Sequence, residues 1–247
     1  MIGFLLTVLG VWGTMHLYVL LRVWGYVGFP ARWLGLLALV GLALMLSPIG
    51  GVALAHAGHV GVGRPLAWFG MLWTGAFFLF FSVSLLHDAY NGLLTALHYA
   101  VPALSGVRLL GTWPIVGEAI LVGVLTVYGV FEASRIRVEH VQVPTDELPA
   151  GVQRIRVAQI SDVHLGLIVG HRRLERILEL VRDAGPDIIV STGDLVDAEM
   201  SGLDELGSVL AAVEAPRGKF AITGNHEYYA GLDQALQFTR RAGFTVL

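Results

Sequence analysis

The sequence contains no cysteine. Disulfides and thiolate metal sites are therefore excluded, and any bound metal must be held by oxygen and nitrogen ligands. Charged residues are also scarce, at 14% of 247 residues, where about 25% is usual for a soluble protein. The net charge is −3 and no basic stripe is present, so we expect no nucleic-acid partner.

The few charges are distributed unevenly along the chain. Residues 1–131 contain four arginines and two acidic residues, whereas residues 132–247 contain the other twelve basic and seventeen acidic residues. All six tryptophans lie in the first part. Because the two parts differ in the solvent they prefer, we predict a transmembrane domain over residues 1–131, a linker over 132–153 and a second domain over 154–247.

The first part contains four long apolar runs, residues 2–21, 33–55, 65–86 and 109–131. Each has roughly the 20 residues that a helix needs to cross the hydrocarbon core of a bilayer. We therefore predict an α-helical transmembrane bundle of about four spans in a multi-pass integral membrane protein, with the lipid bilayer as its partner. The less apolar residues 89–107 are predicted to form a partly interfacial connection, and a fifth span is the alternative.

Four spans would place both termini on the same side of the membrane. Three arginines near the span ends then fall on each side, so the positive-inside rule gives a tie. The two arginines that follow the first span, Arg22 and Arg32, favour an extracytoplasmic position for the second domain.

Glu118 lies inside the fourth apolar run, where a charge is costly. It could mark an ion or substrate path, and a transporter or channel with a regulatory soluble part would then follow. Alternatively, Glu118 lies near the interface, or it is neutral and hydrogen-bonded to another helix. The sequence leaves these interpretations open.

The second domain alternates between strand and helix patterns. The predicted order is strand 155–160, helix 171–184, strand 187–190, a helix begun by a capping box of Ser201 and Asp204, strand 219–223, helix 232–241 and strand 244–247. Strands that alternate with amphipathic helices indicate βαβ units. The predicted fold class is therefore α/β with a mostly parallel sheet.

Three polar motifs follow the first three predicted strands: SDVH at 161–164, GDLVD at 193–197 and GNHE at 224–227. Asp162 and Asp194 are 32 residues apart, and Asp194 and Asn225 are 31 apart, which is one βα unit each time. Ligands of parallel sheets bind beyond the carboxyl ends of the strands. We therefore expect the three motifs to meet at one edge of the sheet.

Asp162, His164, Asp194 and Asn225 offer oxygen and nitrogen donors that suit Mn, Fe, Zn or Mg. Each motif by itself is ordinary turn chemistry. Together they would bring two carboxylates close to each other, and these repel unless a cation lies between them. The order and spacing of the motifs thus predict a metal site formed by these four residues.

The three motifs resemble the first three signature blocks of the calcineurin-like metallophosphoesterases, which hydrolyse phosphate mono- and diesters at a two-metal centre. The resemblance covers about residues 154–247, and the preceding apolar runs are similar to those of membrane-anchored bacterial members. It implies an α/β sandwich with two divalent metal ions. Asp162 and His164 would bind the first metal, Asp194 would bridge both, and Asn225 would bind the second.

The same resemblance implies a catalytic role for His226, as a general acid or a transition-state stabiliser at the substrate phosphate. Asp197 would orient the imidazole of His226. Glu227 completes the third motif, and we assign no chemistry to it.

The family pattern continues with a further His and a Gly-His-x-His block, which supply the remaining ligands. The sequence ends at Leu247 without them, and His171 is predicted to be solvated or to cap a helix. We therefore expect an incomplete sandwich, a fragment of a longer enzyme that has little activity alone.

The leading hypothesis is a membrane-anchored, metal-dependent phosphoesterase. Its phosphoester substrate is unknown, and a membrane tether favours a lipid-linked one because confinement raises the local concentration. The alternative is a non-catalytic membrane protein in which a degenerate phosphoesterase-like module serves binding or assembly.

Overall fold

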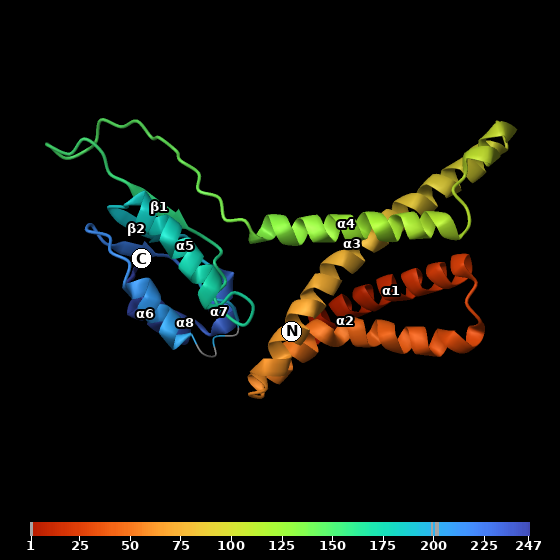
Figure 1. Ribbon diagram of the computed structural model, residues 1–247, viewed down its shortest axis with the longest axis horizontal. Coiled ribbons are helices and arrows are strands. Elements are labelled where there is room, and N and C mark those ends of the chain that lie inside the picture. The colour runs from red at the N-terminus through yellow and green to blue at the C-terminus, as the bar shows by residue number, and fades with distance from the viewer. Residues whose placement is uncertain (1, 199, 201–202) are drawn as a thin grey trace. The chain divides into compact units, whose positions relative to one another are not determined.

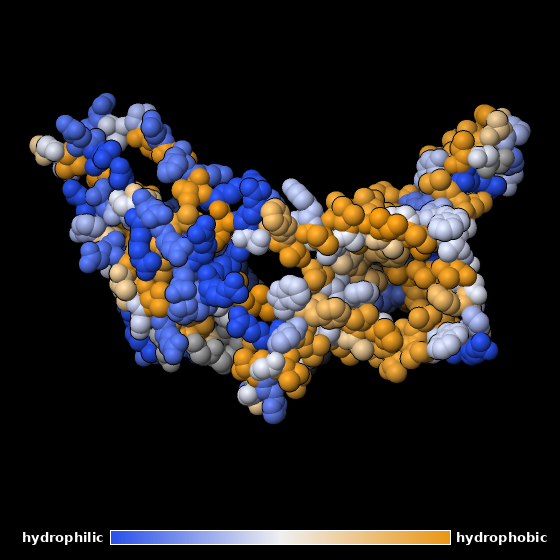
Figure 2. All heavy atoms as spheres, viewed as in Figure 1, coloured by the Kyte–Doolittle hydropathy of each residue, from blue (hydrophilic) through white to orange (hydrophobic). Residues whose placement is uncertain are grey.

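The computed structural model describes residues 2–198, 200 and 203–247 (Figure 1). The chain divides into two compact units. The helical unit comprises Met1–Leu54 and Gly61–Arg135, and the α/β unit comprises Ala55–Val60 and Ile136–Leu247. Hydrophobic side chains cover the visible face of the helical unit, whereas hydrophilic ones predominate on the α/β unit (Figure 2).

The helical unit consists of four long helices and two short 3₁₀ turns. The helices are α1 (Ile2–Val27), α2 (Leu34–His56), α3 (Val60–His98) and α4 (Thr112–Ser134), and the turns are η1 (Ala31–Trp33) and η2 (Pro102–Val107). Each long helix has the length and composition needed to cross a membrane. Large apolar side chains point outward, as at Leu86, Trp113 and Val127, which is the arrangement that a lipid environment favours.

Within the predicted interfacial connection over residues 89–107, α3 continues as a helix to His98. This helix has 39 residues and is about 58 Å long, which exceeds the roughly 30 Å of a hydrocarbon core. Asn91 stabilises the added turns, since its amide donates to the carbonyl of Leu109 and accepts from the Leu109 amide. The described residues contain four candidate spans, and residues 89–107 do not form a separate fifth one.

Glu118 is bonded to other helices, as one of the interpretations of the sequence expected. Its side chain is 7% exposed and forms two 2.8 Å contacts with the guanidinium of Arg22 on α1. It also accepts a hydrogen bond from Ser84 on α3. A buried carboxylate thus connects three helices of the unit.

The α/β unit contains one sheet of four parallel strands in the order β1–β2–β3–β4. The strands are β1 (Val157–Ile160), β2 (Ile188–Ser191), β3 (Lys219–Ala221) and β4 (Thr245–Val246), and the helices are α5 (His171–Ala184), α6 (Asp204–Ala211), α7 (Asn225–Ala230) and α8 (Leu232–Arg241). The predicted α/β class and the parallel sheet are confirmed, and α5 and α8 have the predicted bounds. Ser201 of the predicted capping box lies outside the described residues.

One face of the sheet forms the core of this unit. Ile160, Ile189 and Ala221 are buried there against leucines of α5 and α6 and against Phe238 of α8. On the opposite face, the register aligns Gln159, Val190 and Phe220 across the strands, and none of these side chains is fully buried. The sheet therefore buries one face well and the other only partly.

Candidate metal centre

The loops that follow β1 and β2 stay paired beyond the strands. The Asp162 amide donates to the Gly193 carbonyl at 3.2 Å, and the His164 amide donates to the Asp194 carbonyl at 3.0 Å. An isolated parallel bridge joins Leu165 and Val196, both of which are fully buried. This pairing places the first two polar motifs side by side at the carboxyl edge of the sheet.

Three residues of these loops have a left-handed backbone. The φ angles are 52° at Asp162, 52° at His164 and 50° at Asp194, and these are the only positive φ values at non-glycine positions in the described chain. Asp and His tolerate this region better than most residues, although such a conformation costs about 1–3 kcal/mol. All three are predicted metal ligands, so backbone strain is concentrated at the candidate site.

Two glycines allow the loops after β2 and β3 to approach each other closely. Gly193 has a φ of 104°, and a Cβ there would lie 2.9 Å from the Gly224 amide nitrogen. A Cβ at Gly224 would overlap the carboxylate of Asp194. The Asp194 carboxylate also accepts a 2.9 Å hydrogen bond from the backbone amide of His226. The third motif is thereby held against the second.

Three of the four predicted ligands converge. Asp162, His164 and Asp194 each offer a donor atom, and these atoms lie within 4.8 Å of one another. His164 Nε2 is 3.9 Å from Asp162 Oδ1. The fourth predicted ligand, Asn225, is the first residue of α7 and directly precedes His226. Carboxylate and imidazole donors in this arrangement fit a divalent cation.

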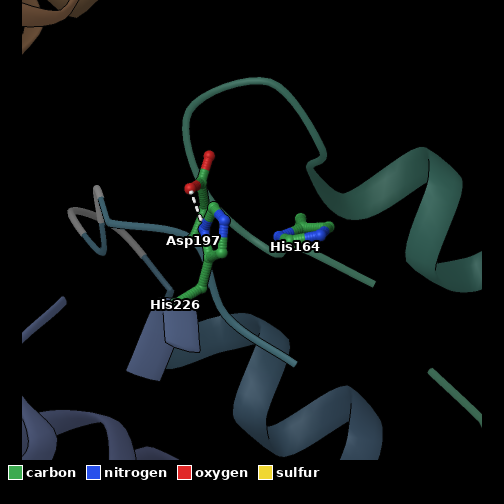
Figure 3. Close-up of side chains that lie close together, drawn as sticks. All are labelled: His164, Asp197 and His226. Atoms are coloured by element: carbon green, nitrogen blue, oxygen red, sulfur yellow. Dashed lines mark hydrogen bonds and ion pairs between the residues drawn. The ribbon is translucent and has the colours of Figure 1, made fainter. Parts of the chain in front are cut away.

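His226 and Asp197 form a pair beside this group (Figure 3). His226 Nδ1 lies 3.0 Å from Asp197 Oδ1. An ionised carboxylate only accepts, so Nδ1 carries the proton and Nε2 is the nitrogen left for a ligand or substrate. The rings of His164 and His226 meet edge to face with centroids 4.3 Å apart.

Asp197 could also take part in metal binding, because the donor atoms of His164, Asp197 and His226 lie within 4.8 Å of one another. His171, in contrast, begins α5 and pairs with Glu175 at 3.2 Å, with nearly half of its side chain exposed. The structure therefore brings five of the predicted site residues together, and His171 is not among them.

Glu227 has a role that the sequence reasoning missed. Its side chain is buried and accepts hydrogen bonds from the backbone amides of four residues. The donors are Gly224 at 2.7 Å, Leu195 at 2.8 Å, Asp194 at 3.1 Å and Val196 at 3.4 Å. One carboxylate thus fixes the loop that carries Asp194 to the start of α7.

A recognisable signal for Glu227 was present in the sequence. Glu227 is the third residue of α7 and accepts from the backbone amide of the N-cap Gly224, which is the glutamate half of a capping box. Glycine has no side chain to supply the other half. The helix itself was not predicted, because its six residues are too few to show a periodic apolar face.

We predict that Glu227→Gln destabilises the protein by about 1–3 kcal/mol, because the amide NH₂ would face backbone donors and leave them unpaired. Thermal denaturation of the full chain in detergent would measure this. Glu179→Gln, on the exposed surface of α5, is the matched control and should have little effect. Equal stability of the two variants would contradict the role assigned to Glu227.

Comparison with known proteins gives independent information on this unit. Residues 155–244 match the family model described as calcineurin-like phosphoesterase. An uncharacterized metallophosphoesterase of Aquifex aeolicus is 44% identical over 129 residues, which is 52% of this chain and 48% of the relative. A transmembrane protein with metallophosphoesterase domain of Danio rerio is 37% identical over 111 residues, or 44% of this chain and 25% of the relative.

A UDP-2,3-diacylglucosamine pyrophosphatase of Chlamydia muridarum is 36% identical over 80 residues, which is 32% of this chain and 24% of the relative. The chain thus spans about half or less of the length of these curated relatives. No solved structure matches the chain. Residues 155–244 therefore form a calcineurin-like metallophosphoesterase domain.

Proposed function

We propose that the chain is a membrane-anchored, metal-dependent phosphoesterase that hydrolyses a phosphate mono- or diester. The observation that carries this proposal is the convergence of Asp162, His164 and Asp194 next to the His226–Asp197 pair. The four candidate spans and the relatives named transmembrane proteins support the anchoring. The match to the family model supports the reaction class.

The residues present fit divalent metal ions. We propose that Asp162 and His164 hold the first metal, that Asp194 bridges two metals and that Asn225 holds the second. Mn, Fe, Zn and Mg all suit this set of oxygen and nitrogen donors. When bound, the metals would neutralise charge on the phosphoryl group and lower the pKa of a water molecule near the substrate.

His226 is proposed as the residue that acts on the substrate directly. Its Nδ1–H is held by Asp197 at 3.0 Å, which fixes the ring plane and directs Nε2 to the substrate. When Nε2 also carries a proton, the imidazolium can give that proton to a leaving oxygen or stabilise phosphoryl charge. The backbone amide of His226 binds Asp194, so the imidazole and the bridging ligand are positioned by one short segment. Asp197 is a positioning residue in this scheme.

Metal binding and hydrolysis should separate in two variants of a full-length version of the protein. Loss of a residue that only supports a metal ligand lowers metal affinity by roughly 10- to 100-fold. Asp194→Asn changes a proposed ligand itself, so it should weaken Mn²⁺ affinity by more than this. His226→Gln should keep Mn²⁺ binding and lower aryl phosphodiester hydrolysis by about 10²- to 10⁴-fold. Titration calorimetry and a colorimetric assay measure the two effects.

Asp183→Asn, at the end of α5 and outside the metal centre, is the control and should behave as the wild type in both assays. Unchanged Mn²⁺ affinity in Asp194→Asn would contradict the metal site. The protein could instead bind Mn²⁺ and show no hydrolysis that depends on His226. That result would favour the alternative function, a non-catalytic module for binding or assembly.

For the substrate, we propose a lipid-linked phosphoester. The Chlamydia muridarum relative is named for a diacylated nucleotide sugar, and the helical unit provides apolar surface for a bilayer. A Mn²⁺-loaded full-length version in nanodiscs should therefore hydrolyse a phospholipid head group faster than a nucleotide or a simple aryl phosphodiester. Equal rates on all three substrates would remove the argument for lipid.

We further propose that the metallophosphoesterase domain lies on the extracytoplasmic side of the membrane. Arg32, in the connection that follows α1, supports this orientation. Arg22 does not count toward it, because it lies within the span Leu6–Val27 and pairs with Glu118. Protease added to sealed cells should then cleave within the polar segment 135–156, which has no helix or strand. Protection until the cells are permeabilised would indicate the opposite orientation.

A further inference from the structure

A cluster of polar side chains is buried inside the helical unit. It consists of Arg22 on α1, Ser84, His87 and Asp88 on α3, and Glu118 on α4, and we call it the Arg22 cluster. Arg22, His87 and Glu118 are each less than 9% exposed. The guanidinium makes 2.8 Å contacts with both Glu118 oxygens and a 2.9 Å contact with Asp88 Oδ1. All three elements are candidate spans, so these charges lie among membrane helices.

His87 has hydrogen-bond partners on both ring nitrogens. Nε2 lies 2.7 Å from the carbonyl oxygen of Leu109, which can only accept, so Nε2 carries a proton. Nδ1 contacts a carboxylate oxygen of Glu118 and lies 2.8 Å from Nη2 of Arg22. A flipped ring would put carbon atoms against both oxygens and lose these bonds.

The Nδ1 contacts allow two protonation states. If Nδ1 has a lone pair, it can accept from Arg22, but it then faces the lone pairs of an ionised Glu118. If one proton lies between Nδ1 and Glu118, that contact becomes a hydrogen bond within a charged or neutral pair. The contacts of Nδ1 are compatible with both states. The net charge of the whole cluster distinguishes between them.

The charges do not balance without this proton. Arg22 contributes one positive charge, whereas Asp88 and Glu118 contribute two negative charges, which leaves a net charge of −1. An uncompensated charge among membrane helices is costly. One proton shared by His87 and Glu118 makes the cluster neutral.

The other groups that face the cluster supply no positive charge. The Tyr18 hydroxyl donates to Asp88 at 2.6 Å, and the Ser84 hydroxyl donates to Glu118 at 2.9 Å. The Tyr26 ring lies 6.2 Å from the His87 ring and 5.2 Å from the Arg22 guanidinium carbon. Among the described contacts of the cluster, Arg22 is the one permanent cation.

We propose that His87 and Glu118 form a proton-binding site, in which one bound proton completes a neutral connection between α1, α3 and α4. The ligand is a proton, and its site is separate from the metal centre of the α/β unit. Asp88 and Arg22 also line a cavity of about 440 Å³ together with Tyr18 and Tyr26. The Asp88 side chain is one-third exposed, so the cavity provides the cluster with a route for proton exchange.

Nitrogen NMR of the histidine rings tests this proposal in the full chain, labelled with ¹⁵N-histidine and held in lipid bicelles at pH 7. The chain has nine histidines, and the signal that His87→Gln removes identifies His87. Protonation of both ring nitrogens of His87 is the expected result. The shared proton can instead reside on Glu118, and His87 is then neutral. Infrared spectra would in that case show a carboxylic-acid band that Glu118→Gln removes, which also supports the proposal. Neutral His87 without that band would overturn it.

Charge-changing variants test the balance itself. Glu118→Gln and Asp88→Asn each remove one negative charge, so the cluster becomes neutral without the proton, and the doubly protonated His87 signal should be lost in both. Ser82→Ala, at an exposed position of α3, is the control and should keep the signal. A doubly protonated His87 in Asp88→Asn would contradict the charge argument, and melting curves in bicelles would show that each variant is folded.

Discussion

The candidate metal centre depends on one buried carboxylate and the backbone amides around it. Glu227 accepts from the amides of Gly224, Asp194, Leu195 and Val196, and it has no exposed oxygen to offer a substrate. Because an unpaired buried carboxylate is far more costly than a paired one, the loops can hardly separate without unfolding. This constraint keeps Asp194 in a left-handed backbone conformation. The strain at Asp194 is thus maintained by Glu227, a residue outside the set of proposed ligands.

The two units accommodate groups of charged side chains by different means. In the α/β unit, the carboxylates of Asp162 and Asp194 lie near each other without a neighbouring lysine or arginine among their described contacts, which is the environment that a divalent cation satisfies. In the helical unit, Arg22 lies between Asp88 and Glu118 and satisfies most of the charge within the protein. The α/β unit therefore offers a site that suits cations. In the helical unit, one additional proton would make the cluster neutral.

Much of the fold could be predicted from the sequence, because its signals are local. The helix α5 has leucines at helical spacing and ends before Gly185, whose φ of 57° stops the helix. The meeting of Asp162 and Asp194 followed from their place at the ends of neighbouring parallel strands, one βα unit apart. The extension of α3 to His98 could not be predicted, because it depends on the bonds of Asn91 to a segment that lies 18 residues away.

Other features were missed because they are properties of tertiary contacts. The left-handed backbone at three ligands and the amide cage of Glu227 arise only when three loops meet. The pairing of Glu118 with Arg22 joins residues 96 positions apart, so a sequence reading leaves Glu118 as an isolated charge.

Anomalous X-ray scattering from crystals of the full chain grown with Mn²⁺ would locate the metal directly. A peak is expected within coordination distance of Asp162, His164 and Asp194 at the carboxyl edge of the sheet. A peak at other residues, or none there at saturating Mn²⁺, would contradict the proposed metal site.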